Sequence, residues 1–185
     1  YNMDELIKFR SVSAMGEMTA RLFTRNREKA RIILRRIMWN LNDESGGIGW
    51  GSPEAMGEIL SKSPELALEF RSILFSYLDP DGNFLEHEML QRGVIWGIGT
   101  YLSVAPDDLS WKTKNFLSGH LHSDDPVKRG DAVRALVNAG RFDCRSLPDD
   151  IMNDTGTLDL YDGWHFIHTT VSTIALSCKD QRIFA

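Results

Sequence analysis

Apolar residues recur at helical spacing along most of the chain. From residue 30 to residue 41 they occupy positions i, i+3, i+4, i+7, i+8 and i+11, which is one face of a helix with 3.6 residues per turn. Asn26 directly precedes this segment and is its expected N-cap. Similar patterns predict further helices at about 3–23, with a break near Ser11–Ser13, and at about 52–60, 64–78, 84–103, 106–122 and 124–139.

Proline and glycine mark most of the predicted helix ends. Ser52-Pro53 and Ser63-Pro64 each place a serine ahead of a proline, which predicts a serine cap followed by proline at the first helical position. Gly93 and Gly97 lie one turn apart inside a predicted helix, and such a costly pair predicts close approach of another helix. The pattern indicates five to seven helices, mostly in antiparallel pairs, arranged as a bundle or as a stack of helical hairpins.

The period changes near the C-terminus. Segments 157–161 and 164–168 alternate apolar and polar residues on either side of Asp162-Gly163, which predicts a β-hairpin with a two-residue type I′ turn. Thr169 or Thr170 then begins a last helix. We therefore expect a single domain over residues 1–185, with a hairpin-plus-helix cap at about 156–179 that packs on the helices.

The loop after the helix at residues 30–41 is the first candidate binding site. It carries four glycines between Gly46 and Gly51, and glycine accepts backbone angles that other residues avoid. Carboxylates are disfavoured at a helix C-terminus, so we expect Asp43 and Glu44 to lie beside Trp50, held by an arginine or by backbone N–H groups. Glu54 and Arg92 complete the candidate binding set, with Arg92 or the arginine-rich helix as the expected partner of these carboxylates.

The charge of the chain is uneven. The 185 residues carry a formal net charge of −5, yet the segment from Arg21 to Arg36 alone is net +6. Within it, Arg27, Arg31 and Arg35 form a stripe that we expect to face solvent. This stripe weakly favours nucleic acid through attraction to phosphates, but the acidic remainder of the chain argues against an extended basic track.

Other chemistry has little support in the sequence. The five histidines form no metal motif, and Cys144 and Cys178 have no zinc spacing, so we expect no metal, no cofactor and no catalytic residue. The acidic start Tyr1-Asn2-Met3-Asp4-Glu5 lacks the basic and apolar regions of a signal peptide, and the uncharged stretch 93–106 is too short to span a membrane. We therefore expect a cytoplasmic protein that does not bind membranes.

The tryptophans are large enough to dominate buried area. We expect Trp39, Trp96 and Trp111 to fill the core. Trp50 is the expected exception, because the small residues of the glycine loop give it little cover.

Residues 121–136 resemble a HEAT-type repeat of the phycobilisome-lyase-like class. Such repeats place Asp-Pro at a turn and an arginine shortly after it; here these are Asp125-Pro126 and Arg129. One departure is Lys128, where the class has an aliphatic residue. More broadly, segments 42–59, 91–99, 160–163 and 170–171 look like a group of HEAT-repeat proteins from anaerobic bacteria.

These resemblances imply a fold rather than an activity. The fold they imply is all-α, an α-α superhelix of the HEAT/armadillo-like solenoid type with a small C-terminal β-hairpin. Solenoids of this kind present a concave surface, so we expect a non-catalytic scaffold or adaptor whose partner is another protein. The alternatives are a nucleic-acid-binding protein resembling HEAT-fold alkylpurine DNA glycosylases, and a chromophore or cofactor lyase.

Overall fold

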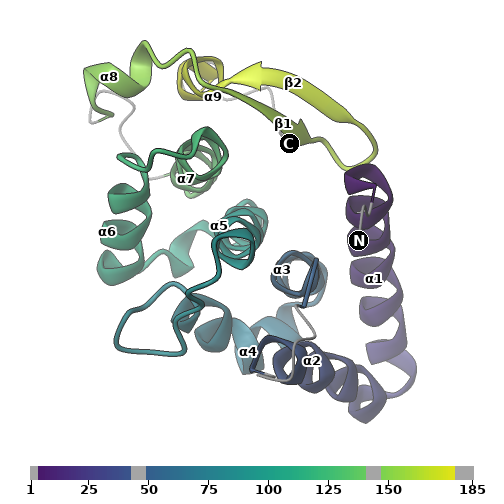
Figure 1. Ribbon diagram of the computed structural model, residues 1–185. Coiled ribbons are helices and arrows are strands. Elements are labelled where there is room, and N and C mark those ends of the chain that lie inside the picture. The colour runs from purple at the N-terminus through teal and green to yellow at the C-terminus, as the bar shows by residue number, and fades with distance from the viewer. Residues whose placement is uncertain (1–3, 43–48, 141–146, 178–185) are drawn as a thin grey trace.

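The computed structural model describes residues 4–42, 49–140 and 147–177. Over these residues the chain forms nine α-helices, one 3₁₀ turn and a two-stranded antiparallel sheet (Figure 1). The helices are α1 Glu5–Arg25, α2 Arg27–Asn42, α3 Ser52–Lys62, α4 Pro64–Ser76, α5 Glu88–Leu102, α6 Trp111–His120, α7 Pro126–Asn138, α8 Asp149–Met152 and α9 Val171–Ser177; the 3₁₀ turn is η1 Pro106–Asp108, and the strands are β1 Thr157–Tyr161 and β2 Phe166–Thr170.

The helices pack in a regular succession. Figure 1 shows α3, α5 and α7 nearly end-on, side by side, with α1 beyond α3 and α9 beyond α7. Along this row each helix contacts the next, while α2 packs on α1 and α3, α4 packs on α3 and α5, and α6 packs on α7. The expectation of a mainly helical chain with a small sheet is therefore confirmed. The helix count exceeds five to seven partly because α8 is a single short turn of 4 residues.

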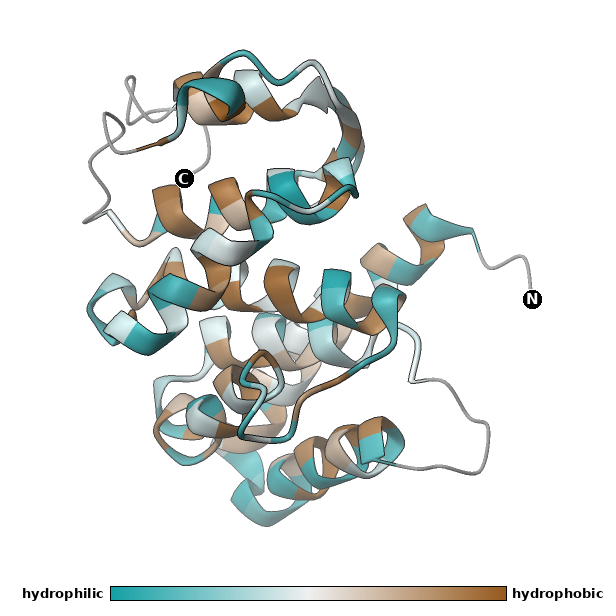
Figure 2. Ribbon diagram, turned by 60° about the vertical axis from the view of Figure 1, so that its left-hand side comes forward, coloured by the Kyte–Doolittle hydropathy of each residue, from teal (hydrophilic) through white to brown (hydrophobic). Residues whose placement is uncertain are grey.

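Helix α5 lies at the centre of the core. Apolar stripes run along the helices in Figure 2, and on α5 the side chains of Val94, Ile95 and Ile98 are fully buried. Where α3 crosses α5, a Cβ added to Gly57 would lie 2.3 Å from the carbonyl oxygen of Gly97. The close helix approach expected from Gly97 is confirmed, and Gly57 is the residue that faces it.

The first two helices refine the expected boundaries. Helix α1 does not break near Ser11, because the Ser11 hydroxyl donates to the carbonyl oxygen of Ile7 at 2.8 Å and is satisfied within the helix. Asn26 is confirmed as the cap of α2, since its side-chain oxygen accepts a hydrogen bond from the Lys29 N–H at 3.0 Å.

The proline-containing helix starts differ from the expected serine caps. Helix α3 begins at Ser52 itself, so its cap is Gly51, whose φ of 79° lies in the left-handed region that glycine tolerates. Ser63 does occupy the cap position of α4, but its hydroxyl makes no capping hydrogen bond. Helix α5 begins at Glu88, later than expected, because the His87 ring accepts the Met89 N–H and caps it there.

The hairpin exists, but its turn was predicted wrongly. Tyr161 pairs with Phe166, so four residues rather than two connect the strands. The Asp162 carboxylate accepts the N–H groups of Trp164 at 2.8 Å and His165 at 2.7 Å. These bonds stabilise a longer turn and remove both residues from the strand. The last helix is capped by Thr170, one of the two expected residues, whose hydroxyl accepts the Thr173 N–H.

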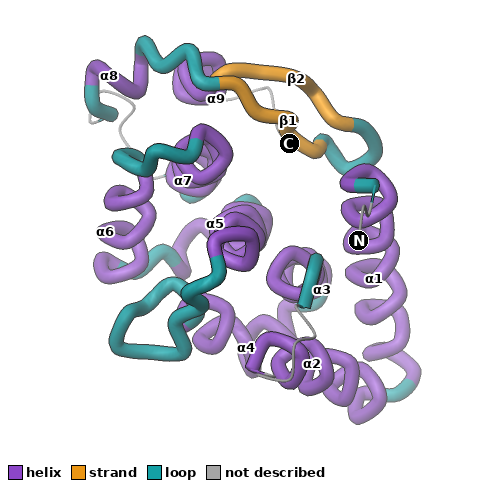
Figure 3. Tube along the Cα trace, viewed as in Figure 1, coloured by secondary structure: helices purple, strands orange, loops and turns teal. Residues whose placement is uncertain are grey.

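The hairpin connects the two ends of the helix row. Figure 3 shows the paired strands running from α9 across to α1. Leu158 of β1 fits against α7 at Gly130, where an added Cβ would lie 2.5 Å from the leucine. At the other end, Arg10 of α1 donates to the Trp164 carbonyl oxygen at 3.1 Å. The hairpin thus covers one side of the row formed by α1, α3, α5 and α7.

Only one tryptophan expected in the core lies there. Trp96 is 5% exposed, but Trp39 is 73% and Trp111 is 78% exposed. Trp39 lies nine residues after the buried Ala30, and this spacing places Trp39 on the side of α2 opposite to the buried face. Trp111 is the first residue of α6, beyond that helix's packed segment. Trp50 is 42% exposed, as expected from its loop.

Candidate functional site

The candidate binding residues do not form one group. Asp43 and Glu44 lie outside the described residues. Trp50 packs edge-on against the His87 ring, with ring centroids 6.0 Å apart. Glu54 and Arg92, in contrast, both line a cleft among the helices. The structure therefore brings together the two residues from α3 and α5 and places Trp50 away from them.

The cleft lies between the helix row and the hairpin. It has a volume of about 280 Å³, just below the usual size of small-molecule pockets. Helices α1, α3, α5 and α7 and both strands contribute to its walls. The lining residues are Glu5, Lys8, Phe9, Glu54, Met89, Arg92, Gly93, Trp96, Val127, Asp131, Asp159 and Phe166.

Glu54 is a buried carboxylate on one wall of the cleft. It is 4% exposed and fits there because the facing residue of α5 is Gly93, where a Cβ would lie 2.4 Å from the Glu54 carboxylate. Its cation is Lys8 of α1, with the Nζ–Oε1 distance 3.2 Å, and not the expected Arg92. Lys8 lies beside Glu54 because α1 packs on α3. The sequence pattern does not reveal this packing.

Burial and the opposite charge of the partner act against each other on the pKa of both Lys8 and Glu54. Burial raises the pKa of Glu54, and the attraction of Lys8 opposes that rise without cancelling it. Burial acts to lower the pKa of Lys8, but Glu54 and Glu5 outweigh it and the pKa is raised. Glu5 lies 2.8 Å from the Lys8 Nζ, so the one ammonium group serves two carboxylates.

Asp131 is the second buried carboxylate, on the α7 wall. It is 4% exposed, and no residue that the structure describes forms a hydrogen bond or ion pair with its carboxylate. Burial raises the pKa of Asp131 to about 7, against the attraction of Arg134 and Arg92. Buried carboxylates without a partner are rare, because leaving one costs a large desolvation free energy. Asp131 therefore retains an unused capacity to accept hydrogen bonds.

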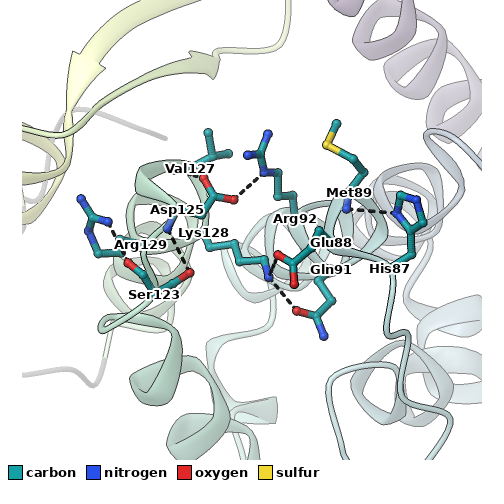
Figure 4. Close-up of polar contacts among 10 residues, drawn as sticks. All are labelled: His87, Glu88, Met89, Gln91, Arg92, Ser123, Asp125, Val127, Lys128 and Arg129. Carbon is teal, nitrogen blue, oxygen red and sulfur yellow. Dashed lines mark hydrogen bonds and ion pairs between the residues drawn. The ribbon is translucent and has the colours of Figure 1, made fainter. Parts of the chain in front are cut away.

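The guanidinium groups nearby have partners already. Arg92 forms an ion pair with Asp125, the N-cap of α7, with the Nε–Oδ2 distance 2.5 Å (Figure 4). Arg134 donates to the carbonyl oxygen of Trp96 at 3.1 Å and to the hydroxyl of Thr100 at 2.7 Å. Both arginines help to offset the charge of Asp131 from a distance, but neither forms an ion pair with it.

A second polar link joins α5 to α7 beside the cleft. The buried Lys128 donates to the side-chain oxygen of Gln91 at 2.8 Å and to the Glu88 carboxylate (Figure 4). Lys128 is the position at which the chain departs from the HEAT-type pattern. Its ammonium group thus takes a structural role between two helices that an aliphatic residue could not take.

The indole of Trp96 lines the cleft and contacts both Phe9 and Arg134. The Phe9 and Trp96 rings meet edge-on at 5.1 Å, and the Arg134 guanidinium lies 5.0 Å from the Trp96 ring centroid, at a distance typical of cation–π contacts. The Trp96 Nε1 is buried and donates to no described atom. The cleft therefore combines apolar walls with two buried carboxylates.

The arginine stripe on α2 is largely neutralised. Arg31 donates to both carboxylate oxygens of Glu69, at 2.7 and 2.6 Å, and Arg35 contacts Glu28 at 2.5 Å. Arg27 is exposed, with its guanidinium 5.5 Å from the Phe23 ring centroid. Two of the three arginines therefore have carboxylate partners that would compete with phosphates.

Within residues 4–42, 49–140 and 147–177, no three His, Cys, Asp or Glu side chains gather closely enough to hold a metal ion. In the same ranges no helix has the length and apolar character needed to cross a membrane. Cys178 and Cys144 both lie outside the described residues.

Sequence reasoning missed Lys8 and Asp131. A signal for Asp131 was available, because it lies between Val127 and Ala135 at four-residue spacing and so interrupts an apolar face of α7. No comparable signal marks Lys8, since a lysine on an amphipathic helix is normally solvated.

Comparisons with known proteins give one relative. No protein-family model and no solved structure matches the chain. An uncharacterised protein of Archaeoglobus fulgidus is 30% identical over an alignment of 188 positions that covers 98% of this chain and 92% of the archaeal protein. The similarity extends over nearly the whole length of both chains. The chain therefore belongs to the same family as this archaeal protein.

Proposed function

We propose that this protein is a non-catalytic binding protein that holds a partner protein at the cleft lined by Glu54 and Asp131. The single observation that carries this proposal is the buried Asp131 carboxylate, which has no described partner and lines an open cleft. A buried polar group without a partner is retained against a free-energy cost. A bound ligand that supplies the missing partner would explain why it is there.

The helix arrangement supports a scaffold role. Under this proposal the packed pairs α1–α2, α3–α4 and α6–α7 are units of a HEAT/armadillo-like α-α superhelix, and α5 packs between α3 and α7. Their support is the contact of each odd-numbered helix with the next and the resemblance of residues 121–136 to a HEAT-type repeat. Stacked helix pairs commonly bind partners on the inner surface that their first or second helices line. Under this proposal the cleft lies on that surface, because α1, α3, α5 and α7 all line it.

The nucleic-acid alternative has less support. Four carboxylates, those of Glu5, Glu54, Asp131 and Asp159, line the cleft beside only two cationic side chains. Such a lining repels phosphates. The carboxylate partners of Arg31 and Arg35 reduce the attraction of the α2 stripe as well. No observation on the described residues favours the chromophore or cofactor lyase.

The proposal is tested by partner capture with a filled cleft. Met89 lines the cleft, so Met89→Trp should obstruct it without changing any charge. Leu68 on α4 is 70% exposed and lies outside the cleft, and Leu68→Trp is the matched control. Tagged wild type and both variants, each shown to be folded by circular dichroism, are used to capture proteins from cells that produce this protein naturally. Quantitative mass spectrometry then compares the captured proteins.

The expected result is a protein enriched equally by wild type and Leu68→Trp and lost with Met89→Trp. Equal enrichment by all three forms would place the partner elsewhere and overturn the role of the cleft. Enrichment of nucleic acid that nuclease treatment removes would favour the alternative.

A further inference from the structure

We propose that the cleft receives a primary ammonium group, that of a lysine side chain of the partner protein, with the Asp131 carboxylate as its counter-ion. This inference rests on the proposed function and specifies the chemistry of the bound segment. Three features of the cleft support this inference: the charged groups that already have partners, the apolar walls and the small volume.

The uncommitted charge in the cleft is negative. Both cationic lining residues are already paired, Lys8 with Glu5 and Glu54, and Arg92 with Asp125. Asp131 has no such partner among the described residues. A ligand anion would have to displace an existing ion pair, whereas a ligand cation gains a buried carboxylate without breaking any ion pair. The cleft therefore favours a cation.

The walls indicate an alkyl chain behind the cation. Phe9 packs edge-on against Phe166 at 5.4 Å and against Trp96 at 5.1 Å, and Met89 and Val127 complete an apolar lining. A lysine side chain buries its four methylene groups along such surfaces and carries the charge at its tip. A bare inorganic cation would leave these walls without contact, and the volume of about 280 Å³ holds one such side chain rather than a large ligand.

A single short carboxylate suits an ammonium group better than a guanidinium group. Arginine gains most where both oxygens of a carboxylate are open to its planar fork, whereas lysine presents a compact charge. Asp131 is 4% exposed, so there is little room beside it for a planar fork to reach both oxygens at once. We therefore assign the site to lysine, and arginine is one arm of the test.

Binding should be linked to protonation of Asp131. Since the pKa of Asp131 is raised to about 7, the free protein carries this group mostly protonated at pH 6 and mostly ionised at pH 8. The charged groups that face Asp131 are Glu54 of α3, Arg92 of α5, Asp125 at the N-cap of α7 and Arg134 within α7. Lys8, Glu5 and Asp159 line the same cleft. An ammonium ligand favours the ionised form, so affinity should rise from pH 6 to pH 8, and binding at pH 6 should release a proton.

The probe is Nα-acetyl-lysine N-methylamide, compared with the norleucine, arginine and free butylamine analogues. The readout is the indole ¹H–¹⁵N signal of Trp96, assigned with Trp96→Phe, because this residue lines the cleft. The variants are Asp131→Asn and, as the matched control, Asp81→Asn, whose side chain is 91% exposed. Asp131→Asn should weaken binding of the lysine analogue by about tenfold or more, since a charge-assisted bond is lost, and Asp81→Asn should leave it unchanged.

A second measurement keeps the test valid should Asp131→Asn fail to fold. Calorimetry of wild type at pH 6 in two buffers of different ionisation enthalpy counts the protons released on binding. Release of a proton with the lysine analogue, and none with the norleucine analogue, supports the proposal. Equal affinity for the norleucine analogue, or no proton release, overturns it.

The remaining outcomes separate the two proposals. Tighter binding of the arginine analogue overturns the assignment to lysine, and tighter binding of butylamine overturns a protein as the source of the ammonium group. Partner capture that depends on Met89 without any binding of the lysine analogue overturns this inference alone. Binding of the lysine analogue with partner capture that ignores Met89→Trp overturns the proposed function.

Discussion

The crossing of α3 and α5 at Gly57 is the sharpest test of the packing. An alanine Cβ at position 57 would lie 2.3 Å from the carbonyl oxygen of Gly97 and 2.4 Å from its Cα. Both atoms belong to the backbone, so the clash is relieved only by moving one helix away from the other. Alanine itself would favour the helix by about 1 kcal/mol, while overpacking costs about 1–3 kcal/mol or more.

The steric cost should exceed the gain, because the central core on both sides of the crossing must move with the helix. We expect Gly57→Ala to lower the free energy of unfolding by about 1–2 kcal/mol. For a chain of this size that corresponds to a melting temperature lower by about 2–8 °C. Urea unfolding followed by circular dichroism and a thermal melt measure the two quantities.

Gly119→Ala is the matched control. Gly119 lies in α6 with open space around the position of a Cβ, so the same substitution should raise the free energy of unfolding by up to about 1 kcal/mol. Opposite signs for the two variants are the expected result. A Gly57→Ala protein as stable as wild type would show that α3 and α5 do not meet backbone to backbone, and would refute the packing described above.

Two further predictions concern the buried charges. The pKa of Asp131 is about 7 in the folded state and near 4 in the unfolded state, so the folded state binds more protons between these pH values. The free energy of unfolding of wild type should therefore fall relative to that of Asp131→Asn as the pH rises from about 4 to 7. Urea unfolding of both proteins at pH 5 and pH 8 measures this change, and a difference in stability that does not depend on pH would contradict it. Lys8→Met leaves Glu54 buried without its cation, which should cost about 3 kcal/mol at pH 7; a loss below about 1 kcal/mol in the same assay would show that Glu54 does not depend on Lys8.

Much of the secondary structure was predictable because it depends on local pattern. The buried face of α2, with Ala30, Leu34, Ile37 and Leu41, is the face that the apolar spacing predicts. The hairpin turn was less predictable, since the side chain of Asp162 can stabilise more than one turn length. The spacing of apolar residues identifies which side of a helix is buried, because this information lies within the helix's own sequence.

The candidate site was predictable only in part, because a cleft depends on which helix faces meet. Glu54 and Arg92 were selected from the sequence, and both line the cleft. The expected ion pair between them was wrong. Glu54 instead pairs with Lys8, which lies about 45 residues earlier in the chain. Asp131 was missed for the related reason that its burial depends on the elements that pack on α7, chiefly α5, and not on α7 alone. Asp43 and Glu44 remain predictions outside the described residues.

The hairpin has a consequence for how the molecule opens. In an array where each helix pair touches only its neighbours, the terminal units can open one at a time, and cooperativity is limited. Here Arg10 and Ser13 of α1 bond to Trp164 and Tyr161 across about 150 residues of chain. Opening of α1 must therefore release the hairpin tip, and opening of the hairpin exposes the first helix. We therefore expect the two ends of the helix row to open together as one cooperative unit rather than to fray separately.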